Sequence, residues 1–220
     1  MKCPFKNIIL SFCCLLISYF ACSQNEWIDS IKKAAVTEKQ DSNRINALIY
    51  LGQAYRFSYP DSGLVWSQQA LALAEKLNND SLIFWSYVSV CSCLYPLGNF
   101  SAELDYAYKM QPVAKRLNTA FSRGYANGLM SDAYMNFGEY ETSVAYWRKV
   151  VDITERELPG ELVPVYGNSA LVFARAKQYD SSLFYARKSY QAVLHNNTSG
   201  DDLHFFFSNI FVAMGEAFAG

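Results

Sequence analysis

The stretches LGQAY (Leu51–Tyr55), MSDAY (Met130–Tyr134) and MGEAF (Met214–Phe218) decide the fold that this sequence predicts. Each has a large apolar residue, then a small one, and an aromatic residue three positions after the small one. Two weaker copies lie at 90–94 and 169–173. Steps of 39, 40, 39 and 45 residues separate the small residues Gly52, Cys91, Ser131, Ala170 and Gly215. Similarity at such a period predicts a repeat architecture.

A second pattern begins four residues after each aromatic position. A turn, an aromatic residue and a new helix start recur in GNFSAEL (Gly98–Leu104), GEYETSV (Gly138–Val144), KQYDSSL (Lys177–Leu183) and, one residue shorter, YPDSGL (Tyr59–Leu64). An amphipathic run with apolar residues three and four apart follows each turn, which is typical of a helix with one buried face. We expect the glycine, or its substitute, to end the first helix, and a residue such as Asp61 to cap the second.

Together the two patterns describe a helical hairpin that cannot bury its apolar face alone and must stack on a neighbour. A small residue in the first helix lets the second helix approach closely, and the aromatic residue fills the space where the two helices diverge. The sequence therefore predicts an all-α fold, an α-solenoid of stacked antiparallel helix pairs with a period of about 40 residues.

These features resemble the tetratricopeptide repeat, which has a Leu-Gly step, an aromatic residue, a Gly-aromatic turn and a later alanine. The match covers about residues 41–220 and is good around Leu51-Gly52-Tyr55 and Gly138-Tyr140. The resemblance implies a right-handed solenoid. The period is longer than the usual 34 residues, Leu94 replaces an aromatic residue, and Glu103 stands where the family has a small residue. HEAT-like helical hairpins have a similar period and remain the structural alternative.

The repeat alignment also predicts the organisation of the chain. We expect a signal peptide over 1–23, a capping helix over 24–40 and the repeat array over 41–220. The units of the array are expected at 41–79, 80–118, 119–160 and 161–199, with 200–220 as the first helix of an incomplete unit.

The first residues, MKCPFKNIILSFCCLLISYFACSQ, are typical of an export signal. Lys2 and Lys6 precede an apolar run over 8–20, which is shorter than the roughly 20 residues that span a bilayer. Cleavage after Ser23 fits the ordinary small-x-small pattern, and lipidation of Cys22 is the alternative. The sequence therefore predicts an exported protein, periplasmic or associated with the cell envelope, with Cys22 as the candidate lipid anchor.

No pattern of catalytic or metal-binding residues is evident. Two histidines occur in the whole chain, and no Cys/His spacing suits zinc. Phosphate-binding glycine loops and a Gly-x-Ser-x-Gly elbow are missing. Cys91 and Cys93 are two apart in a predicted helix, so they point in different directions and are expected to be core residues. A formal charge of −1 does not indicate a nucleic-acid-binding surface. We expect no enzyme within these residues, no cofactor and no metal.

A solenoid offers a concave groove walled by its first helices. Polar and aromatic groups mixed on such a wall suit an extended peptide or a partner's helix. For the aromatic residues, bridging between neighbouring repeats is the alternative explanation. The repeat alignment places on this wall Gln53, Arg56, Phe57, Trp85, Ser92, Tyr95, Tyr125, Asp132, Asn136 and Arg175.

The phrases at Asp61–Leu64 and Asp180–Tyr185, together with the export signal, resemble the exported N-terminal repeat regions of certain bacterial sensor proteins. That resemblance implies a non-enzymatic protein- or peptide-binding scaffold within a larger signalling protein that carries a histidine kinase or helix-turn-helix output domain. Signalling through a dimer would be expected, with a downstream transmembrane segment or a lipid anchor as the contact with the membrane. The alternative is a self-contained periplasmic or lipid-anchored adaptor without an output domain.

Overall fold

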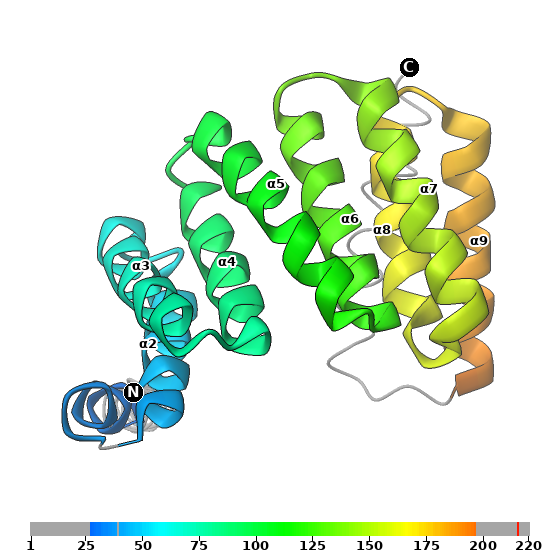
Figure 1. The fold of residues 1–220 in the computed structure, drawn as a ribbon. Coiled ribbons are helices and arrows are strands. Elements are labelled where there is room, and N and C mark those ends of the chain that lie inside the picture. The colour runs from blue at the N-terminus through cyan, green and yellow to red at the C-terminus, as the bar shows by residue number, and fades with distance from the viewer. Residues whose placement is uncertain (1–26, 39, 197–214, 216–220) are drawn as a thin grey trace, which may run out of the picture. The chain divides into compact units, whose positions relative to one another are not determined.

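The chain folds into antiparallel α-helices joined by short turns (Figure 1). The computed structural model describes residues 27–38, 40–196 and 215. Within these residues there is no β-strand, and no helix is both long enough and apolar enough to cross a lipid bilayer.

Residues 27–37 are helical and precede a regular series of longer helices. The longer helices are α2 (Asp41–Tyr55), α3 (Pro60–Leu77), α4 (Asp80–Leu94), α5 (Phe100–Leu117), α6 (Ala120–Asn136), α7 (Tyr140–Glu157), α8 (Leu162–Arg175) and α9 (Tyr179–Asn196). A short 3-10 helix, η1 (Pro159–Glu161), connects α7 to α8. The helices expected from the sequence pattern are thus confirmed for the described part of the array.

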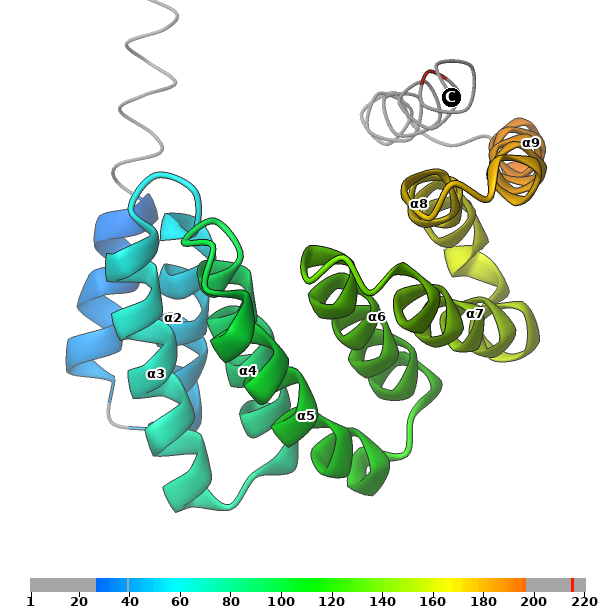
Figure 2. The same ribbon diagram turned by 90° about the horizontal axis from the view of Figure 1, so that it is seen from above.

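The chain divides into two compact units, Met1–Leu97 and Gly98–Gly220. In the first unit α2, α3 and α4 each pack against the other two. In the second unit α5 packs on α6, α6 pairs with α7, and α7 packs on α8, which pairs with α9. Figure 2 shows the α6–α7 and α8–α9 pairs seen from above.

In the first unit, two glycines allow α2 and α3 to approach closely. A Cβ atom on Gly63 would lie 2.9 Å from the carbonyl oxygen of Gly52 and 3.0 Å from Sγ of Cys93. Small polar side chains fill the remaining space, since the hydroxyl of Ser67 lies 2.7 Å from that of Ser89 and donates to the Gly63 carbonyl at 2.8 Å. Gly52 therefore has the role expected for the small residue of the repeat.

The second unit has an apolar core of large side chains. It is formed between the second helix of one pair and the first helix of the next, α7 and α8, and includes Val144, Trp147, Val151, Tyr166 and Phe173. Each side chain is at most 8% exposed. Burial of large side chains between successive pairs, each contributing about 1.5–3 kcal/mol, is what makes one repeat depend on the next.

Backbone conformations with positive φ end the helices at repeating places. Gly98 (φ 67°), Gly138 (φ 78°) and Lys177 (φ 57°) follow the first helices of three units, as the glycine-or-substitute pattern predicted. Asn78 and Asn118 end α3 and α5 in the same left-handed conformation, which asparagine tolerates better than most residues.

The capping expected from Asp61 is wrong in detail. Tyr59 is the N-cap of α3 and forms no side-chain capping bond, while Asp61 lies within the first turn of the helix. Side-chain caps occur at other helices, where Asn79, Asn99 and Thr119 accept bonds from backbone N–H groups. The carboxylate of Asp61 near the helix start still suits the helix dipole.

The expected all-α architecture of consecutive helix pairs is confirmed. Cys91 and Cys93 are buried, as expected of core residues. The signal peptide over 1–23 and the lipidation candidate Cys22 lie outside the described residues. So does the incomplete unit over 200–220, apart from residue 215.

Candidate functional site

A groove lies between α6 and α8 in the second unit, with α7 as its floor. It consists of a cavity of about 300 Å³ and an adjoining one of about 170 Å³, which share Asp132, Trp147 and Asn168. We call it the α6–α8 groove. Its main lining residues are Phe121, Tyr125, Gly128, Leu129 and Asp132 from α6, Trp147, Val150 and Thr154 from α7, and Pro164, Val165, Asn168, Leu171 and Arg175 from α8.

The floor of the groove is built around the indole ring of Trp147. The side chain is 6% exposed, and its Nε1 donates a hydrogen bond of 2.8 Å to Oγ of Ser169. The Ser169 hydroxyl in turn donates to the carbonyl oxygen of Val165 at 2.7 Å. Because the ring is held at its polar edge and packed on its apolar faces, it offers a rigid apolar surface.

Trp147 is a large residue at a position where the other repeats have a small one. Nine residues after the turn the chain carries Ala107 and Ala186 in the neighbouring units. The ring lies against α6, where a Cβ atom on Gly128 would be in ordinary van der Waals contact with it at 3.7 Å.

Two aromatic side chains form one rim of the groove. The rings of Phe121 and Tyr125 lie 5.6 Å apart at 33° on successive turns of α6. Their side chains are 43% and 39% exposed. Exposed aromatic residues beside a concave apolar surface are frequent anchors in protein interfaces, since they bury much area with few rotatable bonds.

The other end of the groove carries opposite charges, with Asp132 on α6 and Arg175 on α8. Neighbouring protein atoms raise the pKa of Asp132 to about 6, and the positive charge of Arg175 opposes that rise. The Asp132 side chain is accessible to solvent, so we expect water to reduce the shift. This end can therefore contact both a donor group and a carboxylate of a ligand.

A buried carboxyl group lies behind Asp132. The Glu103 side chain of α5 is 2% exposed, and Oε2 accepts a 3.3 Å hydrogen bond from Nδ2 of Asn136 on α6. Burial and the negative charge of Asp132 raise the pKa of Glu103 to about 7, while the bond from Asn136 lowers it. The residue that departed from the family pattern is thus an ionisable group linked electrostatically to the groove.

Of the ten residues predicted for the concave wall, Tyr125, Asp132 and Arg175 line the α6–α8 groove. Asn136 lies on the same helix but bonds to Glu103. Trp147 and the groove residues of α8 other than Arg175 were not predicted from the sequence. Trp147 had a visible signal, because it is the one tryptophan among the small residues at its repeat position.

The other predicted residues belong to the first unit. Arg56 donates to the carbonyl oxygen of Gln53 at 3.0 Å, and its guanidinium lies 4.6 Å from the centre of the Phe57 ring. The Ser92 hydroxyl donates to the Val88 carbonyl at 2.8 Å, which satisfies it within α4. Trp85 is half-buried, and Tyr95 follows the last residue of α4 with its side chain exposed. Their role in binding stays a prediction.

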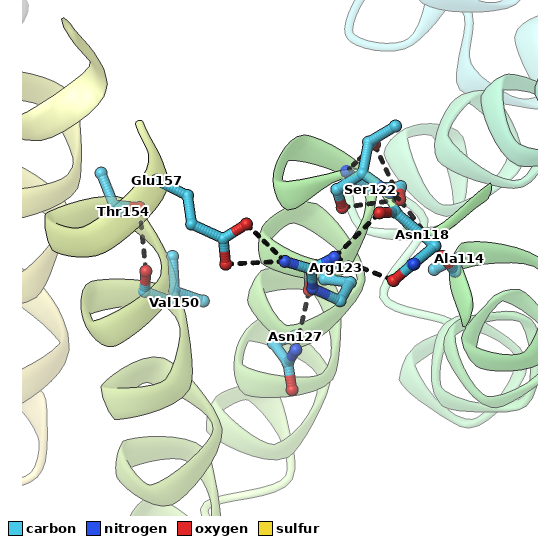
Figure 3. A network of polar contacts seen from close by, with 9 residues as sticks. Ala114, Asn118, Ser122, Arg123, Asn127, Val150, Thr154 and Glu157 are labelled. Atoms are coloured by element: carbon cyan, nitrogen blue, oxygen red, sulfur yellow. Dashed lines mark hydrogen bonds and ion pairs between the residues drawn. The ribbon is translucent and has the colours of Figure 1, made fainter. Parts of the chain in front are cut away.

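An ion pair near the start of α6 holds the two groove-forming helices of one pair together (Figure 3). The guanidinium of Arg123 donates to both carboxylate oxygens of Glu157 on α7 at 2.7 Å. The same guanidinium donates to the backbone carbonyl and side-chain oxygen of Asn118, the C-cap of α5. Three consecutive helices are thereby joined at one end.

The described residues contain no group of three or more His, Cys, Asp or Glu side chains placed to hold a metal ion. The polar groups that line the groove are an aspartate, an asparagine, an arginine, a tyrosine, a threonine and a glutamate. This set provides hydrogen bonds and charge for recognition.

No protein-family model and no curated protein matches the sequence. Several solved structures have a similar fold. A Rap protein complexed with competence and sporulation factor superposes with a TM-score of 0.69 at 14% identity, over 80% of this chain and 52% of that one. BtubC (BKLC) from P. vanneervenii gives a TM-score of 0.68 at 12% identity, over 89% and 83% of the two chains.

A third structure, a putative kinesin light chain from Podosopora anserina with nearly identical TPR-like repeats, has a TM-score of 0.57 at 13% identity, over 81% of this chain and 98% of that one. This chain spans about half the length of the Rap protein. At such identities the likeness concerns the fold alone. It confirms the tetratricopeptide-like array of helix pairs that the sequence pattern predicted.

Proposed function

We propose that this chain is a non-enzymatic binding module whose α6–α8 groove holds an extended peptide segment of a protein partner. The observation that carries the proposal is the groove itself. It has a rigid indole floor, an aromatic rim, and opposite charges at one end, Asp132 and Arg175. An extended segment can place apolar side chains over Trp147 and direct its polar groups to the charged end.

The comparison with the Rap protein supports this proposal. That protein, which shares the fold, has been seen complexed with competence and sporulation factor. A helical-repeat scaffold suited to protein interaction agrees with the groove described above.

The proposal is tested by selecting peptides from a random library on the full chain and measuring their affinity for groove variants. Leu129→Asp places a charge on the apolar wall, and Arg175→Ala removes the positive charge at one end. We expect Leu129→Asp to weaken binding of the selected peptides at least about tenfold, since burying an unpaired charge costs more than about 1.4 kcal/mol. Arg175→Ala should weaken it by a smaller factor, since the Arg175 side chain is exposed.

The matched control is Arg156→Ala on α7. The Arg156 side chain is 74% exposed and does not line the groove. Binding by this variant should equal that of the wild type. Selected peptides that bind all three variants equally would place the interaction elsewhere and contradict the proposal.

We also propose that the module is exported to the bacterial cell envelope, where it serves as the partner-binding region of a signalling protein. The positive start, apolar run and small residues before residue 24 support export. Fractionation of cells that express the full chain, with Cys22→Ala as a comparison, tests both location and lipidation. A self-contained periplasmic or lipid-anchored adaptor without an output domain is the alternative, and co-purification of a kinase or DNA-binding domain with the native protein separates the two.

A further inference from the structure

A second and larger cavity lies on a different face of the second unit. It has a volume of about 730 Å³ and lies between α5 and α7, with α6 at its base. It shares no lining residue with the α6–α8 groove. We call it the α5–α7 groove. It is lined by the cationic side chains of Lys115, Arg123, Arg148 and Lys149, and by one carboxylate, Asp152.

Neighbouring groups already neutralise two of these five charges. Arg123 forms the two-bonded ion pair with Glu157 at 2.7 Å. Asp152 pairs with Arg156 at 2.8 Å. This leaves three cations that line the groove without a carboxylate partner among the described residues.

Those three cations are Lys115 on α5, and Arg148 and Lys149 on α7. All three side chains are exposed. The Lys149 ammonium lies 4.3 Å from the centre of the Tyr146 ring, and the Arg148 guanidinium lies 5.7 Å from that of Phe173. Ring contacts of this kind orient a cation but leave its charge available to an anion.

Apolar surface lies between the cations. Pro112 and Ile153 line the groove from α5 and α7, and together with Ala114 they separate the charged groups. A ligand that satisfies this surface needs carboxylates and apolar side chains together. A single small anion gains little here, because water and salt screen contacts with exposed cations.

A tyrosine cluster extends the same helix faces. Tyr108 precedes the groove residue Pro112 by one helical turn, and Tyr146 precedes Lys149 by three residues, so each lies on the face that lines the groove. Tyr134 of α6 joins them, through a hydroxyl–hydroxyl hydrogen bond to Tyr108 and a stacked ring 5.6 Å from that of Tyr146. The three rings give the cationic groove an aromatic end.

We propose that the α5–α7 groove is a second interaction site, which binds an acidic amphipathic segment of a protein partner. Asp and Glu side chains of that segment contact Lys115, Arg148 and Lys149, and its apolar side chains lie over Pro112, Ile153 and the tyrosine cluster. Several carboxylates carried by one segment add their separate weak contacts, and the shared charge steers the encounter. The site shares no residue with the α6–α8 groove, so either binding proposal can be wrong while the other holds.

The test uses a fluorescently labelled peptide with Glu and Leu at helical spacing, and a matched peptide with Gln in place of Glu. Fluorescence anisotropy with the full chain measures the affinity of both. We expect the Glu peptide to bind, and the double variant Lys115→Gln/Lys149→Gln to lose at least about tenfold in affinity. The Gln peptide should bind at least about tenfold more weakly to the wild type.

The control is Lys76→Gln/Arg187→Gln, which removes the same charge from exposed positions on α3 and α9 and should change the affinity by less than about twofold. Leu129→Asp should also leave the affinity for this peptide unchanged.

Equal losses of affinity in both double variants would show non-specific charge attraction and overturn the proposal. So would failure of the Glu peptide to bind, or its displacement by inorganic phosphate at equal concentration. A dimer in sedimentation that Lys115→Gln/Lys149→Gln disrupts would make a second copy of the chain the occupant, and would likewise overturn it.

Discussion

The indole nitrogen of Trp147 and the hydroxyl of Ser169 form a hydrogen bond of 2.8 Å that joins α7 to α8. It connects the second helix of one pair to the first helix of the next. The same indole is the floor of the α6–α8 groove. Stability between repeats and the shape of the proposed binding site therefore depend on one side chain.

The first prediction follows from this double role. Trp147→Phe loses the hydrogen bond but keeps much of the apolar area, so we expect the free energy of unfolding to fall by about 1–2 kcal/mol. Trp147→Ala also leaves a cavity, and should cost about 3–5 kcal/mol. Urea denaturation followed by circular dichroism measures both. Losses of the same size for the two variants would show that the hydrogen bond, and not packing, dominates.

The second prediction concerns the pH dependence that Glu103 gives to stability. Its pKa rises from the ordinary 4.5 to about 7 in the folded chain, so the folded state holds the proton more tightly than the unfolded state. The contribution to stability is then fully present below pH 4.5 and is lost as the pH rises to about 7. Its size is about 3 kcal/mol.

Comparison with Glu103→Gln isolates this effect, because glutamine keeps the shape of the side chain but does not titrate. The wild type should lose stability relative to the variant as the pH is raised from 4.5 to 7. Urea unfolding at several pH values provides the measurement. A difference between the two proteins that stays constant across this range would show that Glu103 titrates normally.

The third prediction concerns the close approach of α2 and α3. A Cβ atom on Gly52 would lie 3.2 Å from the Gly63 carbonyl oxygen and would overlap the hydroxyls of Ser67 and Ser89. We expect Gly52→Ala to destabilise the first unit by about 1–3 kcal/mol, because overpacking forces the helices apart. Gly160→Ala is the control, since nothing lies within 4 Å of the added methyl group. A Gly52→Ala variant as stable as this control would refute the account of the helix crossing.

The sequence was informative where a repeat needs one kind of residue. Gly52 and Gly138 were predictable because a helix crossing and a positive φ exclude most other side chains. At positions where several residue types serve equally well, such as the start of a helix, the sequence predicted the role of a residue less well. The capping role given to Asp61 was wrong, since an acidic residue near a helix start can act through the helix dipole without forming a cap.

The groove was less predictable than the fold. Repeat alignment placed Asp132 and Arg175 on the concave wall, one and five residues after the small residues Ser131 and Ala170 of two first helices. It did not find the floor, because apolar periodicity marks Trp147 as buried without showing which space its ring fills. Glu103 was noticed as a departure from the family pattern, but its partner Asn136 lies 33 residues away and no local pattern links them.

The last prediction separates two roles of Arg123, which Figure 3 shows between Asn118 and Glu157. The side chains of Arg123 and Glu157 are 32% and 46% exposed, so the ion pair alone should contribute no more than about 1 kcal/mol. Arg123 also donates to the backbone carbonyl of Asn118 at 2.9 Å, a contact that removal of Glu157 leaves in place. We therefore expect Arg123→Ala to destabilise the chain more than Glu157→Ala, by about 1 kcal/mol.

The loss of stability in the double variant should not exceed the sum of the two single losses, because both single variants break the same ion pair. Urea denaturation of the four proteins completes the cycle, and equal losses for the two single variants would show that the contact with Asn118 does not stabilise the end of α5.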